Sequence, residues 1–307
     1  MFRLIFGSRR ACKSFNFHTV IKQITATYTM SSDTSNMSGI SLNEVVAGIQ
    51  KFANVSLATS WDNVGLLIEP TTPNLISHIL LTNDLTEDVL EEALTLKNNL
   101  IITYHPLIFV PLKSVTMRSW KERIVAKCLE NKIAVYSPHT SFDSVKGGVN
   151  DWLISAFKDV LEDSKPIQPD VNEPSYGMGR SCTLKTKITV EEAVRLVKER
   201  TKLPYVRLAS ARKTDGLICS IAVCAGSGAS VLKGVPADLY ITGEMLHHDI
   251  LDAIHSGTNV ILTNHSDSER GFLNTFAREL HEILNNECGR SVTISISKAD
   301  RDPLTTV

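Results

Sequence analysis

The chain contains 307 residues, of which 43% are hydrophobic and 21% are charged, so disordered, collagen-like and small disulfide-stapled proteins are excluded. This length fits roughly two domains of about 150 residues each. The 32 Lys and Arg residues balance 33 Asp and Glu residues, for a net charge of −1, and no run approaches about 18 apolar residues. We therefore expect neither a nucleic-acid partner nor a membrane partner.

The first 32 residues differ from the rest of the chain. They contain five basic residues and no acidic one, mixed with Ser, Thr and aromatic side chains. This composition is typical of a mitochondrial transit peptide, and we predict that residues 1–38 form the disordered leader of a mitochondrial protein. The alternative is a tail that translation from Met30 or Met37 omits, which would leave the protein in the cytoplasm. Without those five cations the chain keeps 27 basic against 33 acidic residues.

Helices and strands alternate through the first half of the body. Ser41–Glu44 has the pattern of a capping box, in which the Ser and Glu side chains each bond the other's backbone amide, and it predicts a helix to about Ala53. A second capping box, Ser119–Glu122, predicts a helix to about Asn131. The remaining predictions are a helix over 87–97 and strands over 79–82, 100–103 and 134–137.

A polar, proline-containing stretch at 164–180 predicts a linker, after which the alternation restarts. Thr189–Glu192 begins a predicted helix that ends near Thr201. Strands are predicted over 218–223, 239–242, 260–263 and 292–297. This alternation predicts an α/β fold of mostly parallel sheets covered by helices, with an N-terminal lobe at 39–163 and a C-terminal lobe at 181–307.

The six cysteines are scattered, and none forms a CxxC pair. The closest two, Cys219 and Cys224, lie five residues apart on one predicted strand and therefore point to opposite faces. We expect the cysteines to be reduced, buried, apolar residues rather than metal ligands or disulfides.

Polar clusters follow four of the predicted strands. They are Thr103–Pro106, Pro138–Asp143, Gly243–His248 and Asn264–Glu269, and they hold five of the nine histidines. In open α/β sheets, binding sites form at the carboxyl ends of strands, so these clusters are expected to converge. Another loop, Gly226–Ser230, predicts either a tight turn or a cradle for an anion.

Two imidazoles and two carboxylates from these clusters form a candidate metal site: His105, Asp143, His265 and Glu269. Such ligands suit Zn²⁺, Mn²⁺ or Fe²⁺ better than Ca²⁺, and a carboxylate can bridge two ions. We therefore expect a divalent-metal cofactor, and the ligand set allows a centre of two ions. The alternative is that His265 and Glu269 only cap and pair on the first turn of a helix.

Five stretches, taken together, resemble the Nif-three-like family (Ngg-one-interacting factor three-like), whose members are also known as GTP cyclohydrolase I type 2 homologues. The stretches are SWDNVGLL at 60–67, YHPLIF at 104–109, SPHTSFD at 137–143, TGEMLHHD at 242–249 and NHSDSERG at 264–271. The resemblance spans about residues 41–300. It implies two α/β lobes with a dinuclear metal cleft between them, and a toroidal homohexamer. It also places the family's metal ligands on His105, Asp143, His265 and Glu269.

One position departs from the family pattern. Bacterial members carry His-His-Pro, with the first histidine a metal ligand, whereas this chain has Tyr104 before His105 and Pro106. A phenol is a poor replacement for a neutral imidazole unless it is deprotonated. The resemblance therefore implies that one of the two metal positions has fewer ligands here.

The resemblance and the candidate ligands together predict metal-assisted hydrolysis of an unidentified small molecule, with nucleotides among the candidates. No residue is assigned a catalytic role. Candidates for lining a substrate pocket or orienting the ligands are Tyr104, His139, Glu244, His247 and His248. For His247 and His248 the alternative is a place on a helix surface. A different class of function is a non-enzymatic interaction or metal-handling protein, for example a partner of a transcription coregulator.

Overall fold

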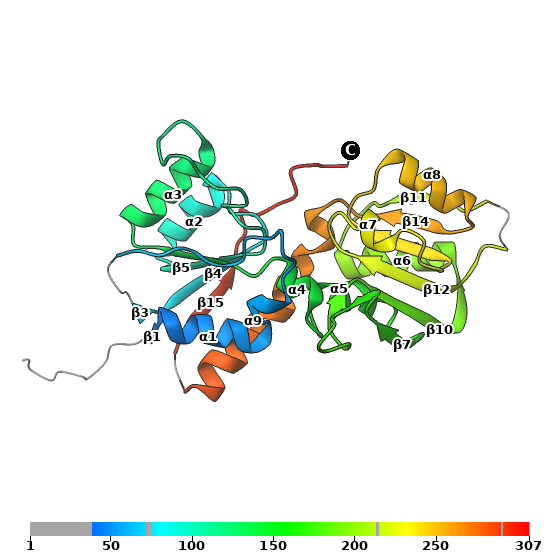
Figure 1. Cartoon of the computed structure of the whole chain (residues 1–307), viewed down its shortest axis with the longest axis horizontal. Helices are drawn as coiled ribbons and strands as arrows, with labels where there is room; N and C mark the ends of the chain where they lie inside the picture. The colour runs from blue at the N-terminus through cyan, green and yellow to red at the C-terminus, as the bar shows by residue number, and fades with distance from the viewer. Residues whose placement is uncertain (1–38, 72–74, 213–214, 290, 307) are drawn as a thin grey trace, which may run out of the picture. The chain divides into compact units, whose positions relative to one another are not determined.

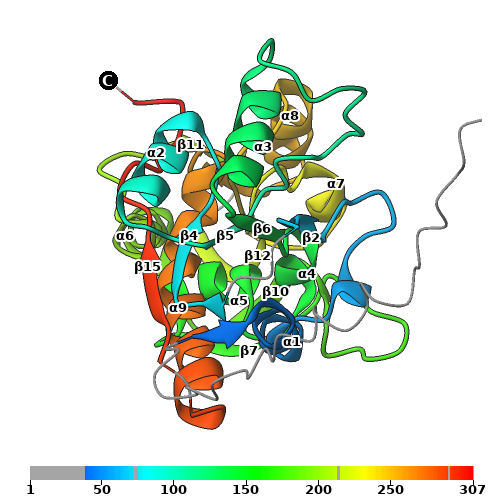
Figure 2. The same cartoon turned by 90° about the vertical axis from the view of Figure 1, so that its left-hand side faces the viewer.

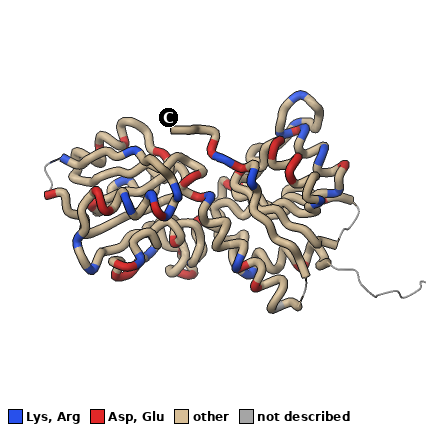
Figure 3. The backbone as a smooth tube through the Cα atoms, turned by 180° about the vertical axis from the view of Figure 1, so that it is seen from behind, with Lys and Arg blue, Asp and Glu red and all other residues tan. Residues whose placement is uncertain are grey.

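The computed structural model describes residues 39–71, 75–212, 215–289 and 291–306. The leader predicted at residues 1–38 and the cysteine at position 12 lie outside the described residues. No helix within the described ranges is both long and apolar enough to cross a lipid bilayer. Lys and Arg are interspersed with Asp and Glu along the described chain (Figure 3).

One large sheet has five strands in the order β15–β4–β5–β6–β2. These are β2 (Gly65–Ile68), β4 (His78–Thr82), β5 (Leu100–Thr103), β6 (Ala134–Ser137) and β15 (Thr293–Ile296). The pairs β15–β4, β4–β5 and β5–β6 are parallel, and only β2 runs antiparallel to its neighbour. For this sheet the prediction of mostly parallel strands is confirmed.

The other large sheet has six strands in the order β11–β14–β13–β12–β10–β7. These are β7 (Leu161–Lys165), β10 (Arg180–Thr189), β11 (Arg207–Ala209), β12 (Leu217–Cys224), β13 (Leu239–Thr242) and β14 (Asn259–Leu262). Only β12, β13 and β14 are parallel to one another, so the prediction of a mostly parallel sheet is wrong here. The physical reason is that β7 and β10 carry exposed polar residues, which an antiparallel sheet tolerates on an open face.

The helices begin where their capping residues predict. Ser41, Ser119 and Thr189 each accept a hydrogen bond from the backbone amide three residues on, and Ser41 with Glu44 forms the complete capping box. The α-helices are α1 (Leu42–Phe52), α2 (Glu87–Thr95), α3 (Trp120–Glu130), α4 (Thr140–Ser144), α5 (Val149–Ile154), α6 (Val190–Thr201), α7 (Ala229–Leu232), α8 (His247–His255) and α9 (Leu273–His281). Two short sheets pair β1 (Ile40–Ser41) with β3 (Leu75–Ile76) and β8 (Gln168–Pro169) with β9 (Gly177–Met178).

Buried side chains alternate between the two faces of each sheet. In β5, Leu100 and Ile102 face one side while Ile101 faces the other. The first side shares one apolar core with the six-stranded sheet and with α1, α5, α6 and α9. The opposite faces are covered by α2 and α3 on the five-stranded sheet and by α7 and α8 on the six-stranded sheet (Figure 1). The protein therefore has a mixed α/β fold with several sheets.

The strands of one sheet do not all come from one continuous part of the chain. β15, near the C-terminus, pairs with β4, so the five-stranded sheet contains a strand from the predicted C-terminal lobe. The stretch predicted as a linker, 164–180, holds β8 and β9. The domain boundaries at 163 and 181 stay a prediction.

Four phenylalanines join the helices next to the candidate metal ligands. Phe142 in α4 lies 4.5 Å from Phe276 in α9 and 5.5 Å from Phe52 in α1, measured between ring centroids. Phe272, just before α9, lies 5.4 Å from Phe142. α1 and α9 themselves pack against each other (Figure 2). This cluster holds α4, which carries Asp143, against the rest of the core.

We expect Phe142→Ala to lower the free energy of unfolding by about 3–5 kcal/mol, because it removes a buried ring and leaves a cavity among three others. Phe142 is only 1% exposed. Chemical denaturation measures the change, and Tyr205→Ala, at an aromatic residue that is 64% exposed, is the control. The control should lose no more than about 1 kcal/mol. An equally small loss for Phe142→Ala would contradict the central role of this ring.

Candidate metal centre

Three side chains from the two large sheets meet at the candidate metal centre. His105 follows β5, whereas His265 and Glu269 follow β14. One ligand atom from each of the three lies within 4.8 Å of the other two, so the group could hold a metal ion. The convergence predicted from the strand ends is therefore present for these three residues.

Glu269 is at the middle of this group. Its Oε2 lies 3.4 Å from His105 Nε2, and its Oε1 lies 3.5 Å from His265 Nε2. Its side chain is 3% exposed, and Asn83 Nδ2 donates to Oε2 at 3.0 Å. Burial raises the pKa of Glu269, but the two histidines and Asn83 outweigh that effect and hold the pKa below its ordinary value. Glu269 is thus a buried, charged carboxylate with each oxygen aimed at a different imidazole.

Both histidines are oriented by a second carboxylate. Nδ1 of His105 lies 3.0 Å from Asp84 Oδ1, and Nδ1 of His265 lies 2.9 Å from Glu244 Oε1. A carboxylate at Nδ1 fixes the ring and leaves Nε2 as the atom that faces the ion, a common arrangement at metal-binding histidines. The donor set and its hydrogen bonds therefore fit a divalent metal. Glu244, predicted as a pocket or orienting residue, orients His265 in this way.

Burial lowers the pKa of His105, but Glu269 beside Nε2 and Asp84 beside Nδ1 outweigh it and raise the pKa to about 11. Without metal, His105 is therefore protonated at neutral pH, and an ion must displace that proton. The stabilisation from this charged pair is complete below about pH 6.5 and is lost as the pH rises through about 11.

We expect Zn²⁺ binding to release about one proton from His105, so that the affinity rises between about pH 6 and pH 8 by up to tenfold per unit. Calorimetric titrations in two buffers of different ionisation enthalpy measure the proton release. Equal apparent enthalpies in both buffers, with an affinity independent of pH, would contradict the protonation of His105.

Asp143 lies beside the group but is not one of its three members. It is in α4 rather than in a loop, is 8% exposed, and accepts a hydrogen bond from Tyr104 Oη at 2.5 Å. Burial raises the pKa of Asp143 to about 6. Burial and the charges of Asp143 and Glu269 also raise the pKa of Tyr104 well above 10, so this phenol is a neutral donor at physiological pH. The role of Asp143 as a metal ligand stays a prediction.

His139 lies next to the group. Its ring centroid is 5.4 Å from that of His105, and its Nδ1 lies 2.7 Å from Asp62 Oδ1. The backbone of His139 has a φ of 32°, a left-handed conformation that is uncommon for a residue with a side chain. Such strain is found where the surrounding contacts over-determine a residue's position. Here Asp62 also accepts from the Thr140 amide at 3.1 Å.

His247 and His248 do not join this group. They lie on the exposed first turn of α8, where their ring centroids are 5.4 Å apart. Glu269 lies between two short 3₁₀ turns, Ser266–Ser268 and Arg270–Phe272, and not in the first turn of a helix where the alternative interpretation placed it.

Four residues of the centre were not among the predicted site residues: Asp62, Asn83, Asp84 and Gly226. Asp84 follows β4, which is a fifth strand end. Its place just beyond a strand was the feature of the sequence that could have indicated it. Gly226 has a φ of +66°, and a Cβ there would lie 2.6 Å from Glu269 Oε1. The loop at 226–230 is therefore a turn whose first glycine leaves room for the buried carboxylate.

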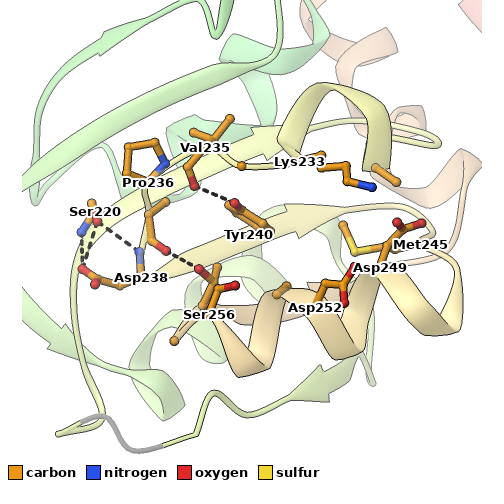
Figure 4. A pocket seen from close by; sticks show the side chains of 16 residues that line it. Ser220, Lys233, Val235, Pro236, Asp238, Tyr240, Met245, Asp249, Asp252 and Ser256 are labelled. Atoms are coloured by element: carbon orange, nitrogen blue, oxygen red, sulfur yellow. Dashed lines mark hydrogen bonds between the residues drawn. The ribbon is translucent and has the colours of Figure 1, made fainter.

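The described cysteines are all free thiols, and Cys128, Cys182 and Cys224 are buried as predicted. Cys288 is exposed and comes directly after Glu282–Glu287, a π-helical segment that continues α9. A cavity of about 550 Å³ lies elsewhere, between α7 and α8 over Tyr240 (Figure 4). Lys233, Asp249 and Asp252 line it, and none of the predicted site residues does.

The fold and the centre together define a mixed α/β protein with a candidate metal site of two histidines and one glutamate. The family model described as Duf34/NIF3 (NGG1p interacting factor 3) matches residues 40–303, and the chain belongs to this family. A NIF3-like protein 1 of Drosophila melanogaster is 48% identical over 89% of this chain and 91% of its own length.

Two solved structures show the same fold. The Bacillus cereus protein related to NIF3 has a TM-score of 0.78 at 22% identity, over 87% of this chain and 99% of that one. Reduced HcgD from Methanocaldococcus jannaschii has a TM-score of 0.71 at 26% identity, over 84% of this chain and 98% of that one.

Proposed function

We propose that this chain is a divalent-metal-dependent hydrolase of a small molecule, with nucleotides the first class to test, and that it holds two ions. The observation that carries the proposal is Glu269, whose two oxygens face His105 and His265 separately. A buried carboxylate with this arrangement is suited to bridge two cations. Asp143, buried beside the group, is the proposed fourth ligand.

Zn²⁺, Mn²⁺ and Fe²⁺ are the proposed ions, and an ion held here would polarise the substrate and lower the pKa of a bound water. Asp84 and Glu244 would orient the two imidazoles throughout. His139, whose Nδ1 is held by Asp62, could take up or deliver a proton through its Nε2. We further propose that each of the two large sheets forms the centre of one lobe, and that the ions bind between the two lobes.

The test is turnover by purified, metal-loaded protein against a panel of nucleotides and phosphoesters. Turnover that requires metal and disappears in His265→Ala supports the proposal. Metal binding without turnover, together with dissociation of the oligomer by a chelator, would favour the alternative of an interaction or metal-handling protein.

A homo-oligomer, in the form of a toroidal hexamer, is also proposed. Five large apolar side chains that follow His105 within about fifteen residues of the chain are exposed: Phe109, Val110, Val115, Met117 and Trp120. Exposed apolar side chains of this kind are typical of a surface that another protein covers. Light scattering gives the mass in solution, and a monomer would contradict this part of the proposal.

We propose a mitochondrial location, on the basis of the acid-free basic leader. A reporter fused to residues 1–32 should enter mitochondria, and a version with the five Lys and Arg residues replaced by Gln should remain in the cytosol. A parent fusion that remains cytosolic would contradict targeting. The internal starts at Met30 and Met37 should likewise give cytosolic protein.

A further inference from the structure

The C-terminal segment at residues 297–302 leaves the five-stranded sheet after β15 and continues toward the chain end (Figure 1). It is first held on α2, where Glu92 accepts hydrogen bonds from Ser297 Oγ at 2.5 Å and from the Ala299 amide at 3.1 Å. Burial raises the pKa of Glu92, but these bonds outweigh it and keep the pKa below its ordinary value. The start of the segment is therefore held on α2, one of the helices that cover one face of the five-stranded sheet.

Asp300 joins the loop after β14, which carries His265 and Glu269, to the loop after β4, whose Asn83 and Asp84 bond Glu269 and His105. Oδ2 of Asp300 accepts the Asn83 amide at 2.8 Å and lies 2.5 Å from Arg270 Nη1. Asn83 itself donates to Glu269, and Arg270 is the residue after Glu269. The side chain of Asp300 is 2% exposed, so this bridge between the loop after β4 and the loop after β14 is shielded from water.

Asp302 binds the loop after β14 at a second point. Its Oδ2 accepts from the backbone amide of Ser266 at 3.1 Å and from its hydroxyl at 2.8 Å. Ser266 follows His265 directly, and Arg270 Nη2 donates to the same hydroxyl at 2.6 Å. Each acid of the segment is thus bonded to the residue next to a candidate metal ligand.

We propose that residues 297–302 position the metal group, with Asp300 holding the loop after β14 against the loop after β4 and Asp302 fixing the start of the loop after β14. The inference rests on metal binding at the proposed centre. His105 comes from one sheet and His265 and Glu269 from the other, so an ion must bring together groups on separate supports. A segment that fixes those supports beforehand removes part of the ordering cost of binding and raises the affinity.

The test is the Zn²⁺ affinity of Asp302→Ala, measured by calorimetry on the full chain, with the melting temperature of the metal-free protein measured in parallel. We expect affinity to fall by about 10- to 100-fold and the metal-free melting temperature to stay within about 3 °C. Asp302→Asn keeps an acceptor oxygen and should restore most of the affinity. Arg301→Ala is the matched control, because the Arg301 side chain is 79% exposed and pairs with Asp88 on the surface.

Unchanged Zn²⁺ affinity in Asp302→Ala, beside normal binding by the parent, would overturn the positioning role and leave the proposed function intact. An equal loss in Arg301→Ala would overturn it as well, because the effect would then belong to the whole tail. Absence of Zn²⁺ binding by the parent would overturn both the proposed function and this inference. Asp300→Ala, which removes the acceptor shared by Asn83 and Arg270, should show a loss at least as large as Asp302→Ala.

Discussion

His265→Ala and Asp143→Ala are each expected to abolish stoichiometric metal binding while the metal-free protein stays folded. His265 presents Nε2 to the group and is held by the exposed Glu244, so its loss removes a ligand without opening the core. Because each side chain is a proposed direct ligand, the loss of affinity should exceed about 100-fold, the upper end for residues that only orient a ligand. Elemental analysis after identical loading gives the metal content per chain.

The matched control is His247→Ala, a histidine of another strand-end cluster that lies exposed on α8. Its metal content should equal that of the parent. Full metal content in both His265→Ala and Asp143→Ala would rule out the site. Full content in Asp143→Ala alone would restrict the centre to His105, His265 and Glu269, the three residues whose ligand atoms already lie together.

Tyr104→His should increase the metal content toward two ions per chain. The Tyr104 phenol is buried and, with its pKa raised well above 10, stays protonated and donates to Asp143. A histidine at this position would offer a neutral nitrogen, which Zn²⁺ and Fe²⁺ bind well, next to a carboxylate released from the tyrosine. One added ligand in an otherwise formed site should raise the affinity of the weaker position by at least about tenfold.

Tyr104→Phe is the control for this substitution, because it also removes the hydroxyl but provides no ligand atom. Its metal content should not exceed that of the parent. If Tyr104→His leaves both stoichiometry and affinity unchanged, position 104 does not contact either ion.

Local signals determined much of the fold. The hydroxyl caps at Ser41, Ser119 and Thr189 predicted the starts of α1, α3 and α6, because a cap acts within three residues of itself. Continuous apolar runs predicted buried strands such as β5 and β13. β7 and β10 carry polar residues on an open face, so their pairing depended on neighbours elsewhere in the chain and was not predicted.

For the metal centre, too, one part could be predicted from the sequence and another could not. The sequence by itself determined which strand ends carry imidazoles and carboxylates, and the rule that sites form at the carboxyl ends of strands predicted that His105, His265 and Glu269 would converge. That they come from two different sheets was decided by the tertiary structure. Only the tertiary structure decided which groups orient them. Asp84 bonds a histidine 21 residues away, and Asp300 bonds the Asn83 amide 217 residues away. Hydrogen bonds over such separations leave no periodic pattern in a sequence, because the partner is chosen by distance in the folded chain.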